Sequence, residues 1–320
     1  MKRRINISRI AIFLVYNLIL GCILAPFIVF WGPFQDLKAM AVGTIATSRH
    51  PQVVEAFLSP DEIKEIMNWS QNQGISSGGQ IYTGSRFTDA EGITIEEVEG
   101  KGFRGIVMLI EDPKRVKLAV TKEIGIAGQR VSDLVAETGA IAGINAGGFY
   151  DPNGKGNGAF PDGITVQNGR IVHNNVGNQK THIVGLNKEG KLIAEDMTAE
   201  QVLEKQIMEA VTFYPVLIRD GKPLIKGDGG WGIGPRTGIG QKADGTIIMV
   251  VIDGRQPTWS IGAKLSDLMD VFMKYHAIIA VNLDGGSSTT MVFRDKIINK
   301  VCGFFGERYI PTAFVVMPKE

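Results

Sequence analysis

The sequence predicts an α+β fold in which a mixed, mostly antiparallel sheet packs against helices, preceded by one N-terminal transmembrane helix. An uncharged run of 22 residues, 10–31, predicts the transmembrane helix. Within residues 81–320, pairs of apolar runs joined by turn residues predict β hairpins, and two segments, 132–138 and 264–275, have the pattern of helices that pack against a sheet. Strands and helices do not strictly alternate, which argues against a doubly wound parallel sheet.

Residues 1–31 predict a membrane anchor with a basic cytoplasmic flank. The first nine residues, MKRRINISR, carry four basic side chains and no acidic one. As a helix, the uncharged run after them spans about 33 Å, enough for a hydrocarbon core of roughly 30 Å, and we expect Pro26 to kink it. Because basic flanks stay in the cytoplasm, everything after Trp31 is expected to lie outside a bacterial plasma membrane.

Two other N-terminal signals compete with an anchor. A cleavable signal peptide has an apolar core of about 7–15 residues, shorter than this run, although Ala39-Met40-Ala41 offers a cleavage site. A lipoprotein signal ending at Cys22 is disfavoured because nine more apolar residues follow that cysteine.

The cysteine content excludes a disulfide framework. The chain has two cysteines, and Cys22 lies in the predicted membrane segment, so Cys302 has no partner. An exported protein without disulfides favours a bacterial surface over a secretory-pathway lumen.

Residues 32–80 are predicted to be an extracytoplasmic stalk. Ser59-Pro60-Asp61-Glu62 has capping chemistry and predicts a short helix that runs to about Asn72. The sequence GISSGGQ, 74–80, is typical of a flexible linker. The main domain is therefore expected to occupy 81–320.

The main domain contains two segments of similar sequence, and we call this similarity the echo. Each predicted helix starts with Ser-Asp-Leu and leads into an apolar strand that ends in Gly-Gly, AIAGINAGG at 140–148 and AIIAVNLDGG at 277–286. The echo predicts a pseudo-two-fold duplication, with both strand ends facing one cleft. Each half is expected to contain a hairpin before the helix and one after the Gly-Gly; the four hairpins are 106–120, 237–254, the pair around Asn168-Gly169 and the pair around Arg294-Asp295.

The loop 145–163 is the first candidate for the site, because it is too long and Gly-rich for a simple connector. Asn145 ends a strand, Gly147 and Gly148 allow close backbone approach, and Asp162 stands just before the next strand. An Asx-capped turn would explain Asn145 alone, but not the echo at Asn282.

Two arginines are predicted at strand ends. Arg236 stands at the mouth of a strand, and Asp253 and Arg255 stand where the second strand of that hairpin ends. Loop arginines are usually solvated charges. Because the guanidinium fork matches phosphate, these two are expected to clamp an anionic group.

The stretch NLDGGSSTT, 282–290, ends the second apolar strand with groups that a plain turn does not need. Successive N–H groups at a glycine pair can form an anion-binding nest, and hydroxyls can bond to phosphate or sugar oxygens. The expected contributors are the carboxylate of Asp284, the N–H groups of Gly285 and Gly286, and the hydroxyls of Ser287, Ser288 and Thr289.

Several other motifs carry less weight. Residues 285–289 nearly match a G-x-S-x-G nucleophile elbow but lack the last glycine, and GDGGWG at 227–232 fits G-x-G-x-x-G without a helix behind it. No cofactor is firmly predicted; Asp162, Asp253 and Asp284 together would suit a divalent cation such as calcium. The formal net charge of +1 gives no reason to expect a nucleic-acid partner.

Three segments in this order and spacing resemble the phosphodiester glycosidase family, and a bacterial surface homologue is the better match. They are NAGGFYDPNG…PDGITVQNGRIV, RTGIGQKADGTIIMVVIDGR and AVNLDGGSSTTMV, and the resemblance covers roughly 100–318. The family often has three glycines where Gly285-Gly286-Ser287 stands here.

The resemblance implies hydrolysis of a sugar-1-phosphodiester, at the glycosyl C1–O–phosphate bond, in an envelope or exopolysaccharide glycan. Asp253 and Asp284 are then expected to act as base or nucleophile and to stabilise the sugar, in an order left open, with Asp162 as a third carboxylate. Arg236 and Arg255 would neutralise the phosphate. Two alternatives remain: a non-catalytic module that binds cell-wall polymer, and a serine hydrolase using Ser287 or Ser288.

Overall fold

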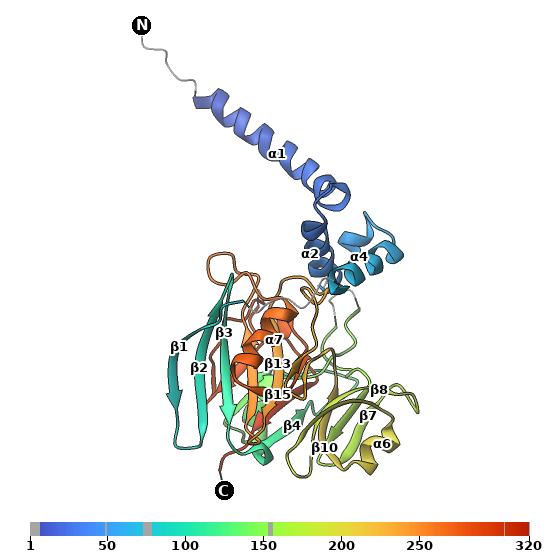
Figure 1. Cartoon of the computed structure of the whole chain (residues 1–320), viewed down its shortest axis with the longest axis vertical. Helices are drawn as coiled ribbons and strands as arrows, with labels where there is room; N and C mark the ends of the chain where they lie inside the picture. Colours follow the sequence, from blue (N-terminus) through green and yellow to red (C-terminus); the bar gives the residue numbers. More distant parts are fainter. Residues whose placement is uncertain (1–6, 49, 73–78, 153–155, 304, 320) are drawn as a thin grey trace.

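The computed structural model describes most of the chain (Figure 1). The first six residues, with most of the predicted basic flank, lie outside the described residues, and so does most of the predicted linker 74–80. The described segments are 7–48, 50–72, 79–152, 156–303 and 305–319.

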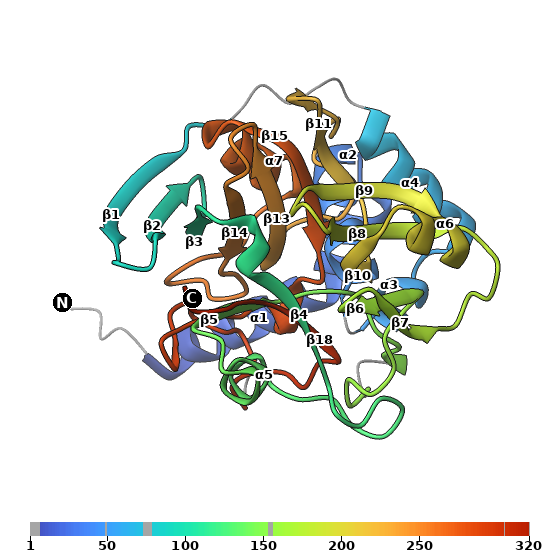
Figure 2. The same ribbon diagram turned by 90° about the horizontal axis from the view of Figure 1, so that it is seen from below.

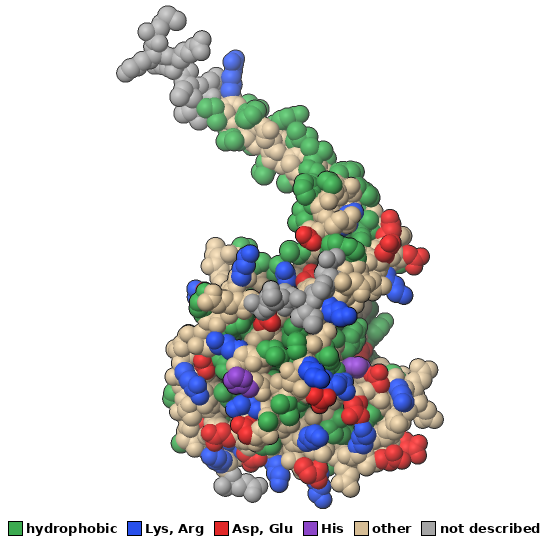
Figure 3. All heavy atoms as spheres, viewed as in Figure 1, with side chains coloured by type: hydrophobic (Ala, Val, Ile, Leu, Met, Phe, Trp, Pro, Cys, Tyr) green, Lys and Arg blue, Asp and Glu red, His purple; other side chains and the backbone are tan. Residues whose placement is uncertain are grey.

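The N-terminal helix α1 (Ile7–Trp31) projects away from the body of the protein, and hydrophobic side chains cover it (Figures 1 and 3). Its segment Arg9–Trp31 is 23 residues long, apolar and not buried, so it is long and apolar enough to cross a membrane. Pro26 lies inside this helix. The helix is compatible with a single-pass anchor or a signal sequence.

Three short helices follow α1. They are α2 (Gln35–Ala46), α3 (Gln52–Glu55) and α4 (Pro60–Asn72). Their shared apolar cluster contains Val42, Val54 and Leu58, together with Phe30 from the end of α1. Burial of this cluster explains why such short helices are stable next to α1.

Helix α4 is the one helix of the three that was predicted, with its capping chemistry. The Ser59 backbone N–H donates to Glu62 Oε2 at 2.8 Å, and the Glu62 N–H donates to Ser59 Oγ at 3.3 Å, so the capping box is formed. Helices α2 and α3 were not predicted. The residue before α2, Phe34, provides no side-chain cap, so the sequence carries no start signal there.

The largest sheet contains eight strands, all paired antiparallel. Their order across the sheet is β1 (Tyr82–Thr88), β2 (Ile93–Gly100), β3 (Phe103–Ile110), β14 (Ile247–Ile252), β13 (Arg236–Lys242), β15 (Ala277–Leu283), β11 (Val216–Arg219) and β12 (Lys222–Pro223).

Two five-stranded antiparallel sheets complete the domain, and Figure 2 shows how they lie beside the large sheet. One has the order β17 (Lys296–Ile297), β16 (Met291–Phe293), β5 (Ala142–Asn145), β18 (Thr312–Val316) and β4 (Val116–Val120). The other has the order β7 (Arg170–Asn174), β6 (Ile164–Gln167), β10 (Ile207–Thr212), β8 (Thr181–Asn187) and β9 (Leu192–Met197).

Helix α7 (Leu265–Lys274) covers the large sheet, α5 (Val131–Thr138) packs on the sheet that contains β5, and α6 (Ala199–Glu204) packs on the third sheet. Phe272 of α7 lies directly over β13. A Cβ atom on Gly238 or Gly240 would come within 2.8 Å of the Phe272 ring, so these glycines are needed for the helix to approach the strand.

The mixed, mostly antiparallel α+β prediction is confirmed, and so are the two domain helices. Three predicted hairpins are formed, by β13 with β14, β6 with β7 and β16 with β17. The hairpin at 106–120 is wrong, because β3 and β4 belong to different sheets. The chain turns away between them at Arg115, a buried residue whose Nε donates to the carbonyl of Met317 at 2.8 Å. The two halves therefore do not have the same strand order.

Candidate active site

The site lies at one edge of the large sheet, where three neighbouring strands meet. β13 begins at Arg236, and its neighbours β14 and β15 run antiparallel to it and end at Ile252 and Leu283. The start of β13 therefore lies between the ends of the other two strands. The residues that follow those ends, Asp253 and Asp284, reach the same edge.

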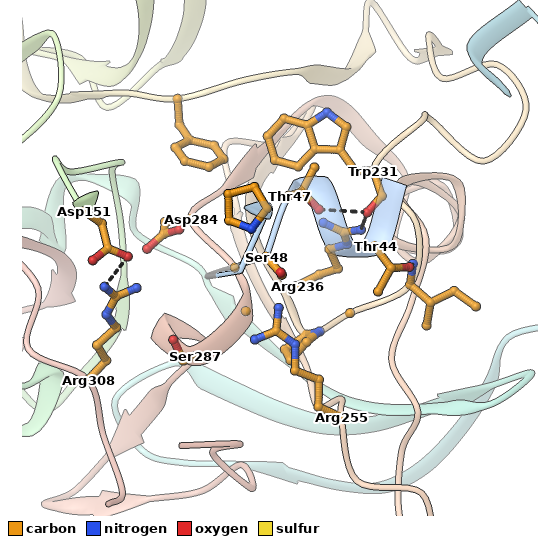
Figure 4. A pocket seen from close by; sticks show the side chains of 17 residues that line it. Thr44, Thr47, Ser48, Asp151, Trp231, Arg236, Arg255, Asp284, Ser287 and Arg308 are labelled. Carbon is orange, nitrogen blue, oxygen red and sulfur yellow. Dashed lines mark hydrogen bonds and ion pairs between the residues drawn. The ribbon is translucent and has the colours of Figure 1, made fainter. Parts of the chain in front are cut away.

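A pocket of about 200 Å³ opens at this edge (Figure 4). Its walls come from α2 and the residues after it, the segment after β10, the Gly-rich loop before β13, the loops after β14 and β15, the long loop after β5 and the segment before β18. The charged side chains that line it are those of Asp151, Arg236, Arg255, Asp284 and Arg308. Opposite charges thus meet in one hollow at the strand ends.

Asp284 is held by its backbone, while its carboxylate is left open. Its N–H donates to the carbonyl of Ala146 at 3.1 Å, and its carbonyl accepts from Asn145 Nδ2 at 2.5 Å. Its Oδ2 is buried and has no hydrogen-bond partner among the described residues. Burial raises the pKa of this carboxyl to about 6; a hydrogen bond from the Ser288 hydroxyl and the Arg308 charge oppose the rise, and the charges of Asp151 and Asp162 add to it.

Asp151 and Arg308 form an ion pair across the pocket from the other two arginines (Figure 4). The Arg308 guanidinium also lies over the ring of Phe149, 4.6 Å from its centroid. Sequence reasoning missed both charged residues. Asp151 lies within the loop that was chosen for its length and glycines, so its position was a usable signal; Arg308 follows no comparable motif.

Arg236 is 5% exposed, and backbone carbonyls hold it. Its Nε donates to Ala263 at 3.0 Å, and its Nη2 donates to Trp231 at 3.0 Å and to Gly232 at 2.8 Å. Burial lowers the pKa of this guanidinium to about 10, with the Arg255 charge adding to the effect, so it remains cationic at neutral pH. Arg236 fixes the Gly-rich loop and adds a permanent positive charge to the pocket.

Arg255 is the exposed arginine of the pocket. Its backbone has a φ of 59°, a left-handed conformation that is uncommon for a side chain of this size, and its N–H donates to Ile261 at 2.9 Å. Its guanidinium lies over Gly286, where a Cβ atom would be 3.3 Å from Nη2. A glycine at 286, whose φ is also 59°, therefore lets the guanidinium approach the loop after β15.

The loop 285–289 contributes less backbone to anion binding than the sequence predicted. The N–H groups of Gly286, Ser288 and Thr289 donate to carbonyls of Pro235, Gly285 and Gly286 at 2.9, 3.1 and 3.3 Å. These three donors are therefore engaged within the protein and do not form an open nest.

The hydroxyls of this loop divide into two groups. Thr289 Oγ1 lies 3.3 Å from Thr237 Oγ1, which donates to it, so it is part of the interior. The hydroxyls of Ser287 and Ser288 are buried; that of Ser288 interacts with the Asp284 carboxylate, whereas that of Ser287 lines the pocket and has no hydrogen-bond partner among the described residues. Ser287 is thus available to a bound oxygen group. No histidine lines the pocket beside it in the described part of the chain, so a serine nucleophile has no imidazole base there.

The structure does not bring Asp253 into the pocket, contrary to our expectation. This carboxylate is 4% exposed, and it accepts hydrogen bonds from Trp259 Nε1 at 2.8 Å, Asn299 Nδ2 at 3.0 Å and the Lys300 N–H at 3.0 Å. Neither Asp253 nor these donors line the pocket. Asp253 therefore anchors the loop that presents Arg255, and it does not meet Asp162 and Asp284 to form the three-carboxylate cation site.

The asparagines at the strand ends have positioning roles. Asn145 is buried; besides its bond to Asp284, its Oδ1 accepts from Thr237 Oγ1 at 2.9 Å and from the Thr290 N–H at 3.1 Å. Asn282 is also buried, and its Nδ2 donates to the carbonyl of Tyr214 at 3.0 Å. Asn145 thus joins the two similar strand ends, while Asn282 bonds to a different loop and does not line the pocket.

The remaining predicted residues lie behind the pocket. A Cβ atom on Gly147 would be 2.7 Å from Val211, and one on Gly148 would be 3.0 Å from Asp162 Oδ2, so both glycines allow close packing. Asp162 is half-buried, and burial raises the pKa of its carboxyl. Its influence on Asp284 is electrostatic.

Two known proteins are similar to this chain in sequence. The SPbeta prophage-derived uncharacterized protein YomE of Bacillus subtilis (strain 168) is 27% identical over 129 residues, which cover 39% of this chain and 20% of that protein. The N-acetylglucosamine-1-phosphodiester alpha-N-acetylglucosaminidase of Mus musculus is 25% identical over 230 residues, which cover 63% of this chain and 42% of the mouse enzyme. The chain thus spans less than half the length of each.

Solved structures share the fold. The catalytic domain of the zebrafish N-acetylglucosamine-1-phosphodiester alpha-N-acetylglucosaminidase, auto-inhibited by its pro-peptide, superposes with a TM-score of 0.59 at 20% identity, over 77% of this chain and 87% of that one. An exported protein of Burkholderia pseudomallei K96243 has a TM-score of 0.50 at 18% identity, over 70% and 77% of the two chains. The sequence model of phosphodiester glycosidases matches residues 138–317, more than half of the chain, and the chain therefore belongs to the phosphodiester glycosidase family.

Proposed function

We propose that this protein is a membrane-anchored, extracytoplasmic phosphodiester glycosidase that hydrolyses a sugar-1-phosphodiester in an envelope or exopolysaccharide glycan. The observation that carries the proposal is the pocket itself, in which the open carboxylate of Asp284 lies in one hollow with the guanidinium groups of Arg236 and Arg255. A carboxylate suits the anomeric carbon of a sugar, and arginines suit a phosphate. The family membership agrees with this division of roles.

The reaction breaks the bond between C1 and the bridging oxygen, and the bonding electrons leave with the phosphate. Water supplies the new oxygen at C1, one of its protons leaves, and the phosphomonoester that departs carries one more negative charge than the diester. Since a phosphate oxygen is a weak base, neutralising this charge matters more than protonating the leaving group. Arg255, with an exposed guanidinium, is placed to do so, and the fixed charge of Arg236 adds to the same field.

Asp284 acts at the sugar. With a pKa of about 6, its carboxyl is mostly ionised at neutral pH, yet more basic than an ordinary aspartate. It is therefore suited to attack C1 or to take the proton from the attacking water; retention or inversion at C1 separates these roles. The Ser287 hydroxyl assists as a donor to a phosphate or sugar oxygen.

The proposal also assigns a role to each part of the chain and a sugar to the substrate. We assign catalysis to 81–320, the stalk to 32–80 and the anchor to 1–31, with the N-terminus in the cytoplasm. The sugar is proposed to be N-acetylglucosamine, because the mouse and zebrafish relatives are named for that substrate.

The test is a hydrolysis assay in water enriched in ¹⁸O. The full chain in detergent micelles is incubated with the methyl phosphodiester of α-N-acetylglucosamine 1-phosphate, with and without a chelator. The proposal expects free sugar that carries the ¹⁸O and methyl phosphate that does not. Label in the phosphate would show cleavage of the P–O bond and overturn the proposal, and binding without turnover would favour a glycan-binding module.

A further inference from the structure

Helix α2 of the stalk reaches the pocket and forms part of its wall. Thr44 lies in the helix, and Thr47 and Ser48 follow its last turn; all three line the pocket together with Pro51 (Figure 4). In Figure 4 these side chains lie beside Trp231 and Arg236. None of them was expected at the site from the sequence, because the stalk carries no chemical motif.

The contact between α2 and the catalytic domain is made backbone to backbone at glycines. A Cβ atom on Gly43 would lie 2.8 Å from both the carbonyl oxygen of Gly230 and the nitrogen of Gly232. A Cβ atom on Gly232, whose φ is 59°, would in turn collide with the backbone of Thr44. The fit thus requires glycine on both sides, and a larger residue at Gly43 must push the helix away from the loop.

Two hydroxyls connect this contact to the buried arginine. Thr44 Oγ1 accepts from the Ile233 N–H at 2.9 Å. The Thr47 hydroxyl donates to the carbonyl of Gly43 within the helix at 2.7 Å, and its Oγ1 also lies 3.2 Å from the carbonyl oxygen of Trp231. The same carbonyl accepts from Arg236 Nη2 at 3.0 Å. The stalk and the guanidinium therefore both contact the carbonyl of Trp231.

The stalk borders the pocket without filling it. Its contributions are small side chains, and no hydrogen bond joins residues 35–48 to the side chains of Asp284 or Arg255. The cavity of about 200 Å³ remains between them. These features are those of a wall, because a blocking segment would place its own groups on the reactive side chains.

We propose that helix α2 is a functional part of the active site, in which Gly43, Thr44 and Thr47 act as positioning residues for the Gly-rich loop and through it for Arg236. The proposal rests on the proposed function, since it assigns the stalk a role in that reaction. Undocking the stalk is expected to weaken hydrolysis even though no stalk residue acts on the sugar.

The test uses the full chain in detergent micelles with the phosphodiester substrate described above. Gly43→Val is expected to lower kcat/KM about tenfold or more. Gly21→Val is the matched control, because nothing lies within 4 Å of that glycine in α1, and it should leave kcat/KM unchanged. Thr47→Val should lower kcat/KM several-fold, and Thr47→Ser, which keeps the hydroxyl, should restore it.

A readout that does not depend on activity accompanies the assay. Amide hydrogen exchange at Ile233, whose N–H bonds to Thr44, should speed up in Gly43→Val and stay unchanged in Gly21→Val. Faster exchange without a loss of activity would overturn the proposal. A rise in activity would also overturn it and identify the stalk as an inhibitory segment. If the wild-type chain fails to hydrolyse any phosphodiester, the proposed function fails, while the exchange data still report whether the stalk is docked.

Discussion

Two loops at the same sheet edge carry nearly the same sequence and have different environments. Ile-Asp-Gly-Arg follows β14 and Leu-Asp-Gly-Gly follows β15, on either side of β13. Three donors satisfy the carboxylate of Asp253, while Asp284 Oδ2 has no hydrogen-bond partner among the described residues. The comparison teaches that hydrogen-bond satisfaction separates an aspartate that holds a loop from one that is free to react.

The comparison is tested most strongly at Asp284. Asp284→Asn is expected to lower kcat/KM at least about 1,000-fold, because the amide can neither attack C1 nor accept a proton from water. The free energy of unfolding at neutral pH should stay the same or rise, since a buried charge is removed. Steady-state kinetics and urea unfolding measure the two effects. Substantial residual activity would place the reactive carboxylate elsewhere.

Arg255 carries the second largest expected effect. Arg255→Met should lower kcat/KM about 100-fold, because one donor to the developing phosphate charge is lost. Stability should change little, since the side chain is exposed. The control is Arg170→Met, an exposed arginine on β7 that does not line the pocket. Equal losses in both variants would contradict the assigned role of Arg255.

For Asp253 the main loss is expected in stability. In the wild type, three N–H donors bond to the Asp253 carboxylate. In Asp253→Asn an amide NH2 group faces one or more of these donors and cannot accept from them, so the free energy of unfolding should fall by about 3 kcal/mol. The rate of hydrolysis should fall less than in Asp284→Asn, because this substitution affects catalysis only by displacing Arg255. Urea unfolding measures the effect, with Asp220→Asn in an exposed turn as the control. A stable but inactive Asp253→Asn protein would reverse the distinction between the two loops.

The same comparison shows how far the sequence predicts the site. The hairpin of β13 with β14 followed from strand pattern and turn residues, and the similarity of the two Gly-Gly strand ends indicated that Asp284 lies at a strand end facing a cleft. Asp253 was not distinguishable from Asp284, because two of the donors that satisfy it, Asn299 and Lys300, come from a distant segment of the chain. The ion pair of Asp151 with Arg308 and the wall formed by α2 depend on contacts between distant parts of the chain, which local patterns do not encode.

The pH dependence separates the loops further. The pKa of Asp284 is about 6 in the folded protein against an ordinary value of 3.8, so kcat/KM should fall about tenfold per pH unit below pH 6. Between these two pKa values the folded state holds a proton that the unfolded state releases. The free energy of unfolding should therefore decrease by about 2 kcal/mol as the pH rises from 4 to 6.

The decrease in the free energy of unfolding is expected to come from the Asp284 carboxyl alone. Urea unfolding measured across this range in wild type and Asp284→Asn isolates it, because the substitution should remove the decrease in stability. If both proteins show the same decrease, the titrating group is another carboxyl.

The smallest expected effect is at Ser287, next to the open carboxylate. Ser287→Ala removes a hydroxyl without a partner, so stability should stay within about 0.5 kcal/mol, and kcat/KM should fall less than about tenfold through one lost hydrogen bond to substrate. A fluorophosphonate probe should not label the wild-type chain, since no histidine lines the pocket among the described residues. Labelling that disappears in Ser287→Ala would make the serine the nucleophile. In that case the open carboxylate of Asp284 would support the serine, and the contrast between the two aspartates would no longer identify the reactive group.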